Sequence, residues 1–203
     1  MIQRLRTFWH DRSAATAVEF TLVLPLLLIL FFGIIDVGVA MWTWNRAEKA
    51  TQMGVRYAVA TDMLPIGLRS YSFTVDGGMN QGEVIPASRF GGATCTSTTC
   101  TCNTGATCPA LGNLDTVAFT RLVTRMQAIM PQIQAANVQV DYGYSGLGYA
   151  GDPNGPDVAP MVTVKLVGMQ FRPITFLAFG GPLTLPDFAA TLSTEDGAGR
   201  WSN

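Results

Sequence analysis

The residues of this chain most suited to chemistry are one carboxylate in an apolar run and four cysteines in a polar segment. Glu19 is the only ionisable residue between Ala14 and Ile35. A carboxylate near the end of a membrane helix costs on the order of 2–3 kcal/mol by insertion scales, so it commonly has a partner and a purpose. The alternative is a glutamate at the level of the lipid headgroups, where it reaches water at little cost.

The four cysteines lie close together in a segment rich in Thr, Ser, Asn and Gly: Cys95, Cys100, Cys102 and Cys108. They form no paired C-x-x-C knuckles, and the only histidine, His10, precedes the apolar run, so we expect no zinc site. An even number of cysteines in such a segment is typical of disulfides in an oxidising compartment. Cys100 and Cys102 are too close to bridge each other. Two pairings remain open, 95–100 with 102–108 or 95–102 with 100–108.

No other pattern indicates catalysis. The chain has no Walker-type loop, no G-x-S-x-G motif and no histidine after the apolar run. Residues 152–157 alternate oxygen ligands as calcium loops do, but two prolines and the missing glutamate favour a proline-bounded turn. We therefore predict that the protein is not an enzyme and has no catalytic residue, metal, cofactor or small-molecule substrate. A net charge of −1 also argues against nucleic acid as a partner.

The apolar run has the length of a membrane span, because about 20 apolar residues in a helix cross the hydrocarbon of a bilayer. Basic residues precede the run and aromatic residues follow it: Arg4, Arg6 and Arg12, then Trp42 and Trp44. This order predicts a basic cytoplasmic leader over 1–14, a single transmembrane helix over 15–44 and an extracytoplasmic remainder. A cleaved signal peptide is the alternative, since residues 38–40 resemble a small-x-small site. The length of the run, Asp36 and Glu19 argue against it.

The helical period continues beyond the span, over residues 45–62. Small and apolar residues recur there at three- and four-residue steps: Ala47, Ala50, Met53, Gly54 and Tyr57. This stripe predicts a helical spine that docks on the chain's own globular part, or else a seam between subunits. Within the span, Pro25 lacks an amide hydrogen and is expected to bend or loosen the helix, with a function or as simple curvature.

Residues 63–203 predict a small α+β head with an antiparallel sheet. Alternating patterns predict strands over 71–75, 138–142 and 161–167, with an edge strand over 188–192. An amphipathic helix is expected over 114–130, capped by Asn113 or Asp115. The cysteine segment predicts a disulfide-stapled loop over 91–110, either a simple insertion or a contact tip. The apolar segment 171–179 is too short to span a membrane; we expect core packing, with a membrane-lying or subunit-contact role as the alternative.

One stretch also resembles a known family. The sequence Ala-Thr-Ala-Val-Glu-Phe at 15–20, followed by the apolar run with Pro25, is similar to the TadE-like minor pseudopilins of the tight-adherence (Flp) type IV pilus system. The resemblance covers about residues 8–60. It implies cleavage by the prepilin peptidase between Ala14 and Ala15, four residues before Glu19. Ala14 departs from the family, which usually has glycine there.

The resemblance implies a pilin-like fold and a structural role in building a thin adhesive pilus, through helix packing and head contacts. Glu19, Phe20 and Pro25 would be the assembly contacts. Cleavage would expose an amine on Ala15 that Glu19 could pair with, in its own chain or a neighbour. The implied partners are the membrane, other pilins or pseudopilins, the assembly platform and the prepilin peptidase. The protein would lie in the bacterial inner membrane with a periplasmic head, or enter the extracellular pilus. The alternative is a membrane-anchored extracytoplasmic binding protein with no pilus role.

Overall fold

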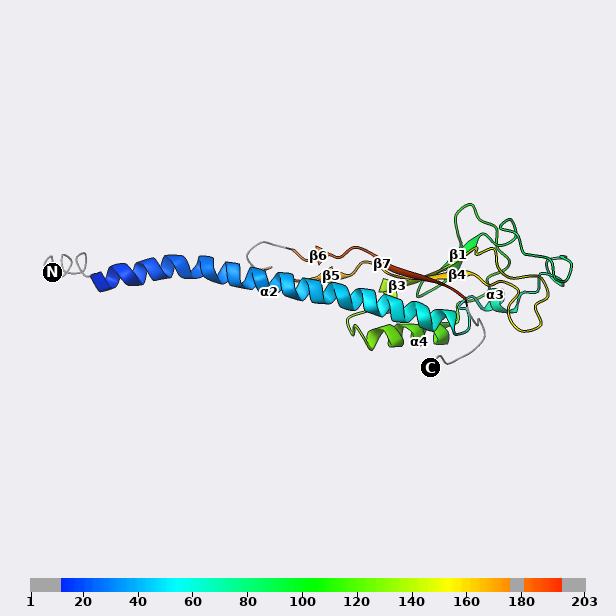
Figure 1. Cartoon of the computed structure of the whole chain (residues 1–203), viewed down its shortest axis with the longest axis horizontal. Coiled ribbons are helices and arrows are strands. Elements are labelled where there is room, and N and C mark those ends of the chain that lie inside the picture. Colours follow the sequence, from blue (N-terminus) through cyan, green and yellow to red (C-terminus); the bar gives the residue numbers. More distant parts are fainter. Residues whose placement is uncertain (1–11, 176–180, 195–203) are drawn as a thin grey trace. The chain divides into compact units, whose positions relative to one another are not determined.

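The computed structural model describes residues 12–175 and 181–194 (Figure 1). They fall into two compact units. Among the described residues, the helix unit comprises 12–43, 170–175 and 181–183, and the sheet unit comprises 44–169 and 184–194.

The long N-terminal helix predicted from the sequence is present. Helix α2 spans Arg12–Val59 and continues through Pro25 without interruption. Proline removes the hydrogen bond to the carbonyl four residues earlier, so it leaves the Thr21 carbonyl without its helical donor. The helix ends before residue 62, the predicted end of the spine. At its C-terminus the Thr61 hydroxyl donates to the Tyr57 carbonyl at 2.8 Å, which satisfies one of the free carbonyls of the last turn.

In the helix unit, α2 is accompanied by a short segment from late in the sequence. Strands β5 (Gln170–Phe171) and β6 (Leu183–Thr184) form a two-stranded sheet, and residues 172–175 follow β5. Of the apolar segment predicted over 171–179, residues 176–179 lie outside the described residues.

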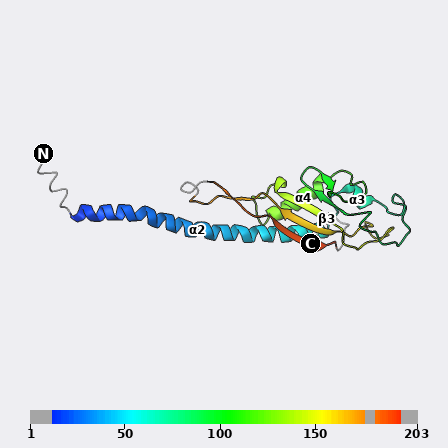
Figure 2. The same cartoon turned by 90° about the horizontal axis from the view of Figure 1, so that it is seen from above.

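The sheet unit contains a five-stranded antiparallel sheet in the order β2-β1-β3-β4-β7. Figure 1 labels β1, β3, β4 and β7 of this sheet, and Figure 2 shows β3 from above. Its strands are β1 (Gly92–Cys95), β2 (Cys100–Cys102), β3 (Val138–Gly143), β4 (Met161–Leu166) and β7 (Phe188–Ser193). Val140 lies opposite Val164, which lies opposite Ala190 on the other side. The predicted antiparallel pair and the predicted edge strand are therefore confirmed, and the fold class is α+β.

The core of the sheet unit lies between the sheet and two helices, the last turns of α2 and helix α4 (Thr116–Gln127). Alternate residues of β3 and β4 are buried, as a sheet with one covered face requires. A Cβ at Gly54 would lie 2.9 Å from the sulfur of Met126 and 3.3 Å from a methyl of Val164. Gly54 thus allows α2 to approach α4 and β4 closely, so the predicted stripe docks on the chain's own head.

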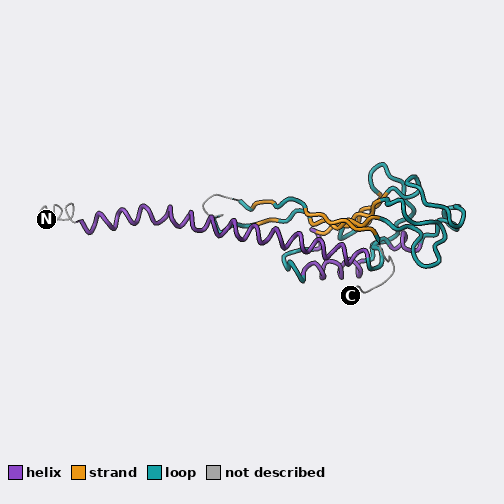
Figure 3. Tube along the Cα trace, viewed as in Figure 1, coloured by secondary structure: helices purple, strands orange, loops and turns teal. Residues whose placement is uncertain are grey.

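One expectation about the head was wrong, and one is refined by the structure. Residues 71–75 are not a strand, because Asp76 accepts the Ser72 amide at 3.2 Å and closes a turn instead. The segment 91–110, predicted as a disulfide-stapled loop, contains both disulfides and also the β1–β2 hairpin. Helix α3 (Ile66–Ser70) and the 3₁₀ helix η1 (Ala135–Asn137) complete the elements of the described residues. Long loops gather at one end of the sheet unit (Figure 3).

Candidate functional site

The residues that the sequence singled out for processing and assembly all lie in helix α2. Ala14 and Ala15 are within its first turn, and Glu19 follows Ala15 by four residues, about one turn. Glu19, Phe20 and Pro25 are exposed, and no described residue forms a hydrogen bond or ion pair with the Glu19 carboxylate. The structure brings the three residues onto one short stretch of helix, where partners outside the chain have access to them.

The surface of α2 around these residues is apolar and uncovered. One helix among the described residues, within Thr16–Val59, is long and apolar enough to cross a membrane. Soluble monomers rarely expose contiguous apolar patches of more than a few hundred Å², so such a surface marks contact with lipid or protein. Its exposed large side chains include Val18, Phe20, Leu22, Val23, Leu26, Leu27, Leu30, Phe31, Ile34, Val37 and Met41.

Asp36, just beyond the apolar run, makes a contact that the sequence did not predict. Its side chain is 7% exposed. The carboxylate accepts hydrogen bonds from the Ile174 amide at 2.6 Å, the Thr175 amide at 2.9 Å and the Thr175 hydroxyl at 2.6 Å. Like Glu19, Asp36 is an acidic residue beside membrane-length apolar sequence, and this position alone could have indicated a role for it. The residues that donate to Asp36 lie far away in the sequence, so the contact itself could not be predicted.

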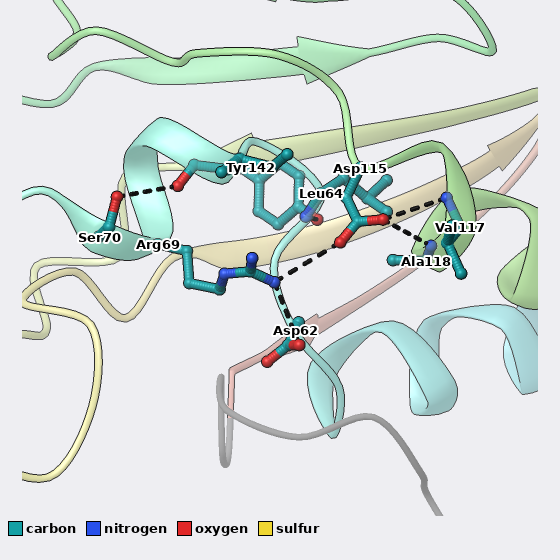
Figure 4. Close-up of polar contacts among 9 residues, drawn as sticks. Asp62, Leu64, Arg69, Ser70, Asp115, Val117, Ala118 and Tyr142 are labelled. Carbon is teal, nitrogen blue, oxygen red and sulfur yellow. Dashed lines mark hydrogen bonds and ion pairs between the residues drawn. The ribbon is translucent and has the colours of Figure 1, made fainter.

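A polar network in the head ties the end of α2 to helices α3 and α4 (Figure 4). The guanidinium of Arg69 lies 3.1 Å from the Asp62 carboxylate and 3.6 Å from that of Asp115. Asp115 also caps α4, accepting the amides of Val117 at 3.1 Å and Ala118 at 2.9 Å. Of the two caps considered from sequence, Asp115 is the one used.

Beside this network, the hydroxyl of Tyr142 is buried and accepts the Leu64 amide at 3.0 Å (Figure 4). Burial raises the pKa of Tyr142 well above its usual value, and the hydrogen bond from Leu64 opposes that shift. The phenol therefore stays neutral and serves as a structural acceptor at the start of the chain's path from α2 into α3.

A pocket of about 300 Å³ opens next to these residues. Its lining carries both signs of charge: Tyr57, Thr61, Asp62, Arg69, Asp115, Val117, Ala118 and Arg121. The Arg69 guanidinium pairs with both carboxylates of the lining, and one of these also caps a helix. Asp62, Arg69 and Asp115 are thus engaged in holding the head together.

The cysteines form two disulfides, one within the β1–β2 hairpin and one from its end to the residues that follow it. Cys95 is bonded to Cys100, and Cys102 to Cys108, which is the first of the two pairings left open by the spacing. The first disulfide joins the two strands of the hairpin, because Cys95 ends β1 and Cys100 begins β2.

The neighbouring strand β3 carries a carboxylate surrounded by donors. Asp141 receives hydrogen bonds from Gln139 and Thr94, both at 2.9 Å, and pairs with Lys165. Burial alone would raise the pKa of Asp141, but these hydrogen bonds and the Lys165 charge lower it below its ordinary value.

The segment that resembles a calcium loop has a structural role. The buried Asp157 carboxylate accepts the Phe73 amide at 2.7 Å and the Asp152 amide at 3.0 Å, so it joins two loops of the head. Within residues 12–175 and 181–194, no group of three His, Cys, Asp or Glu residues is placed to hold a metal ion.

Comparison with known proteins identifies a family for part of the chain. The family model described as TadE-like protein matches residues 14–56, which include Glu19, Pro25 and Asp36. Neither a curated protein nor a solved structure matches the chain. The predicted family resemblance is thereby confirmed for this segment, which is most of helix α2.

Proposed function

Residues 14–56 are TadE-like, and on that premise we propose that the protein is a minor pseudopilin that helps to build a tight-adherence (Flp) pilus. It acts by packing. Its helix contacts lipid and neighbouring subunits, and its head makes the specific contacts. The observation that carries the proposal is the exposed apolar surface of α2 with Glu19, Phe20 and Pro25 on it, all inside the matched segment.

The proposed role of Glu19 follows from the free-energy cost of inserting its carboxylate into the membrane and from its position one helical turn after Ala15. A carboxylate in the apolar run opposes insertion, so its presence is explained by a contact that forms after insertion. Cleavage between Ala14 and Ala15 by the prepilin peptidase supplies an amine one helical turn away. Pairing of Glu19 with the Ala15 amine of a neighbouring chain neutralises both charges and makes neutralisation depend on correct assembly.

The topology is part of the same proposal. The basic leader stays in the cytoplasm, α2 crosses the inner membrane, and the head with its disulfides lies in the periplasm or on the pilus. The assembly platform and other pilins or pseudopilins are the proposed partners.

Substitution of Glu19 tests this proposal. Glu19→Gln and Glu19→Leu should leave membrane insertion intact, measured as resistance to alkaline extraction, because both remove a charge from the span. Both should lower the yield of sheared pili about tenfold or more, since each 1.4 kcal/mol lost from a contact costs about tenfold in affinity. Thr21→Ala, at an exposed neighbouring position of α2, is the matched control and should assemble normally.

The contrary result is informative. Normal pilus yield with Glu19→Leu would mean that the carboxylate only reaches the headgroups. It would favour the competing function, a membrane-anchored extracytoplasmic binding protein.

A further inference from the structure

The contact between Asp36 and residues 174–175 fixes a second segment of the chain against the helix. We call residues 170–175 the strap. Two successive amides and one hydroxyl of the strap point at a single carboxylate, with donor–acceptor distances of 2.6–2.9 Å. Hydrogen bonds to an ionised acceptor are about twice as strong as neutral ones. Loss of the strap would also leave a carboxylate unsatisfied beside apolar sequence, so Asp36 sets where the strap lies along α2.

The strap turns apolar and basic groups outward. With its amide bound to Asp36, the Ile174 side chain is 56% exposed. Arg172 is exposed as well, and it forms no ion pair with any residue in the described part of the chain. An exposed isoleucine beside a cation is the combination found where a protein meets the boundary between acyl chains and phosphates.

Next to the strap, α2 has an apolar groove of about 480 Å³. Thr175 closes it on one side, and the helix supplies the rest: Ile29, Leu30, Gly33, Ile34 and Val37. A Cβ added at Gly33 would meet nothing within 4 Å, so its floor is open. The groove is continuous with the apolar, membrane-length surface of α2.

The lining favours a flexible occupant over a rigid one. Close packing of a second helix uses small residues repeated over several turns, but Gly33 is the only small residue that α2 contributes to the groove. Branched side chains around one glycine leave an irregular slot that suits an acyl chain. The strap satisfies the Asp36 carboxylate by hydrogen bonding. Arg172 carries a positive charge that attracts lipid phosphate.

We propose that the strap is a lipid-contacting element of the outer leaflet. Ile174 and the groove contact phospholipid acyl chains, Arg172 lies at the phosphates, and Asp36 is the positioning residue that holds the strap there. This inference rests on the proposed membrane anchoring by α2, and adds a second membrane contact to it.

Fluorescence quenching in the full-length chain tests the inference. Cysteine is introduced as Ile174→Cys, labelled with a polarity-sensitive fluorophore after the native disulfides have formed, and reconstituted into phosphatidylcholine–phosphatidylglycerol vesicles. We expect blue-shifted emission, quenching by lipids with a nitroxide high on the acyl chain, and protection from aqueous iodide. Leu27→Cys, in the apolar run, should be quenched by nitroxide lipids, and Thr120→Cys, exposed on α4, by iodide.

Asp36→Ala in the Ile174→Cys chain should remove the lipid quenching at position 174 and leave the signal from position 27 unchanged. Asp36→Asn keeps one acceptor oxygen, so it should lose less of the lipid quenching at position 174. A label at position 174 that iodide quenches would overturn the inference, as would one that neither agent reaches, since protein would then cover it. Failure of lipid quenching at position 27 would instead overturn membrane anchoring, and both proposals with it.

Discussion

Acidic side chains in this protein serve mainly as acceptors that join distant parts of the chain. Asp36 receives donors from the strap, Asp115 caps α4 while pairing with Arg69, and Asp157 links two loops. Glu19 differs, because no described residue satisfies its carboxylate. Each of the others has a partner within its own unit, which is why an unsatisfied carboxylate on an apolar helix points to a partner outside the chain.

Asp141 gives the clearest pH dependence. Its pKa is lowered in the folded state from an ordinary value of 3.8, so its contacts stabilise the fold fully above that value. This stabilisation is lost as the pH falls through the lower, folded-state pKa. At about pH 5, the native chain should have a higher free energy of unfolding than Asp141→Asn. This difference should shrink as the pH is lowered to about 2.

Urea unfolding in detergent, followed by tryptophan fluorescence at several pH values, measures this difference. Asp187→Asn is the control for removing one carboxylate charge, since Asp187 is exposed beside β7. A gap between native chain and Asp141→Asn that stays constant down to acid pH would contradict the assignment.

At the scale of elements, regular apolar patterns predicted most helices and strands correctly. Contacts made by individual side chains could not be predicted from such patterns. Strands β3, β4 and β7 follow from alternation, and α4 from its apolar period ending near Pro131. The alternation over 71–75 was misleading, because Asp76 offers the backbone a turn that competes with a strand. No pattern in the neighbouring sequence predicts the contact between Asp36 and the strap, because the acceptor and its donors are separated by 138 and 139 residues. Spacing also left the disulfide pairing open.

The β1–β2 hairpin is expected to be fully oxidised. Alkylation and non-reducing mass spectrometry of the exported protein should find no free thiols, with Cys95 linked to Cys100 and Cys102 to Cys108. Replacing Cys102 and Cys108 by serine should lower the stability by about 2 kcal/mol, the entropic value for a loop of this size. Prior reduction, which should give four alkylated cysteines, is the control. Four reactive thiols in untreated protein would place the head in a reducing compartment.

For the whole molecule, one helix serves two different environments. The part of α2 in the helix unit exposes large apolar side chains, and the part in the sheet unit buries small residues such as Ala47 and Ala50 in the head. The change from bulky to small residues along α2 was readable from the sequence. It separates a surface suited to lipid or subunits from one suited to the chain's own core.

The proposed processing applies to the molecule as it matures. In cells that contain the prepilin peptidase, N-terminal sequencing of the membrane-extracted protein should begin at Ala15. Ala14→Gly should increase the processed fraction because it restores the smaller residue of the family, and Ala14→Lys should block cleavage. An intact Met1 would count against the peptidase, and a start near Met41 would indicate a signal peptide instead.

The disulfide between Cys95 and Cys100 also changes what a protease can do to the head. Thr96–Thr99 form the turn that this bond closes, and hydrolysis of one peptide bond there opens a ring without releasing a fragment. Strand β1 remains paired with β3, which holds the clipped end in register. A head exposed to secreted proteases would thus be nicked at its hydroxyl-rich turn and still persist as one covalent molecule.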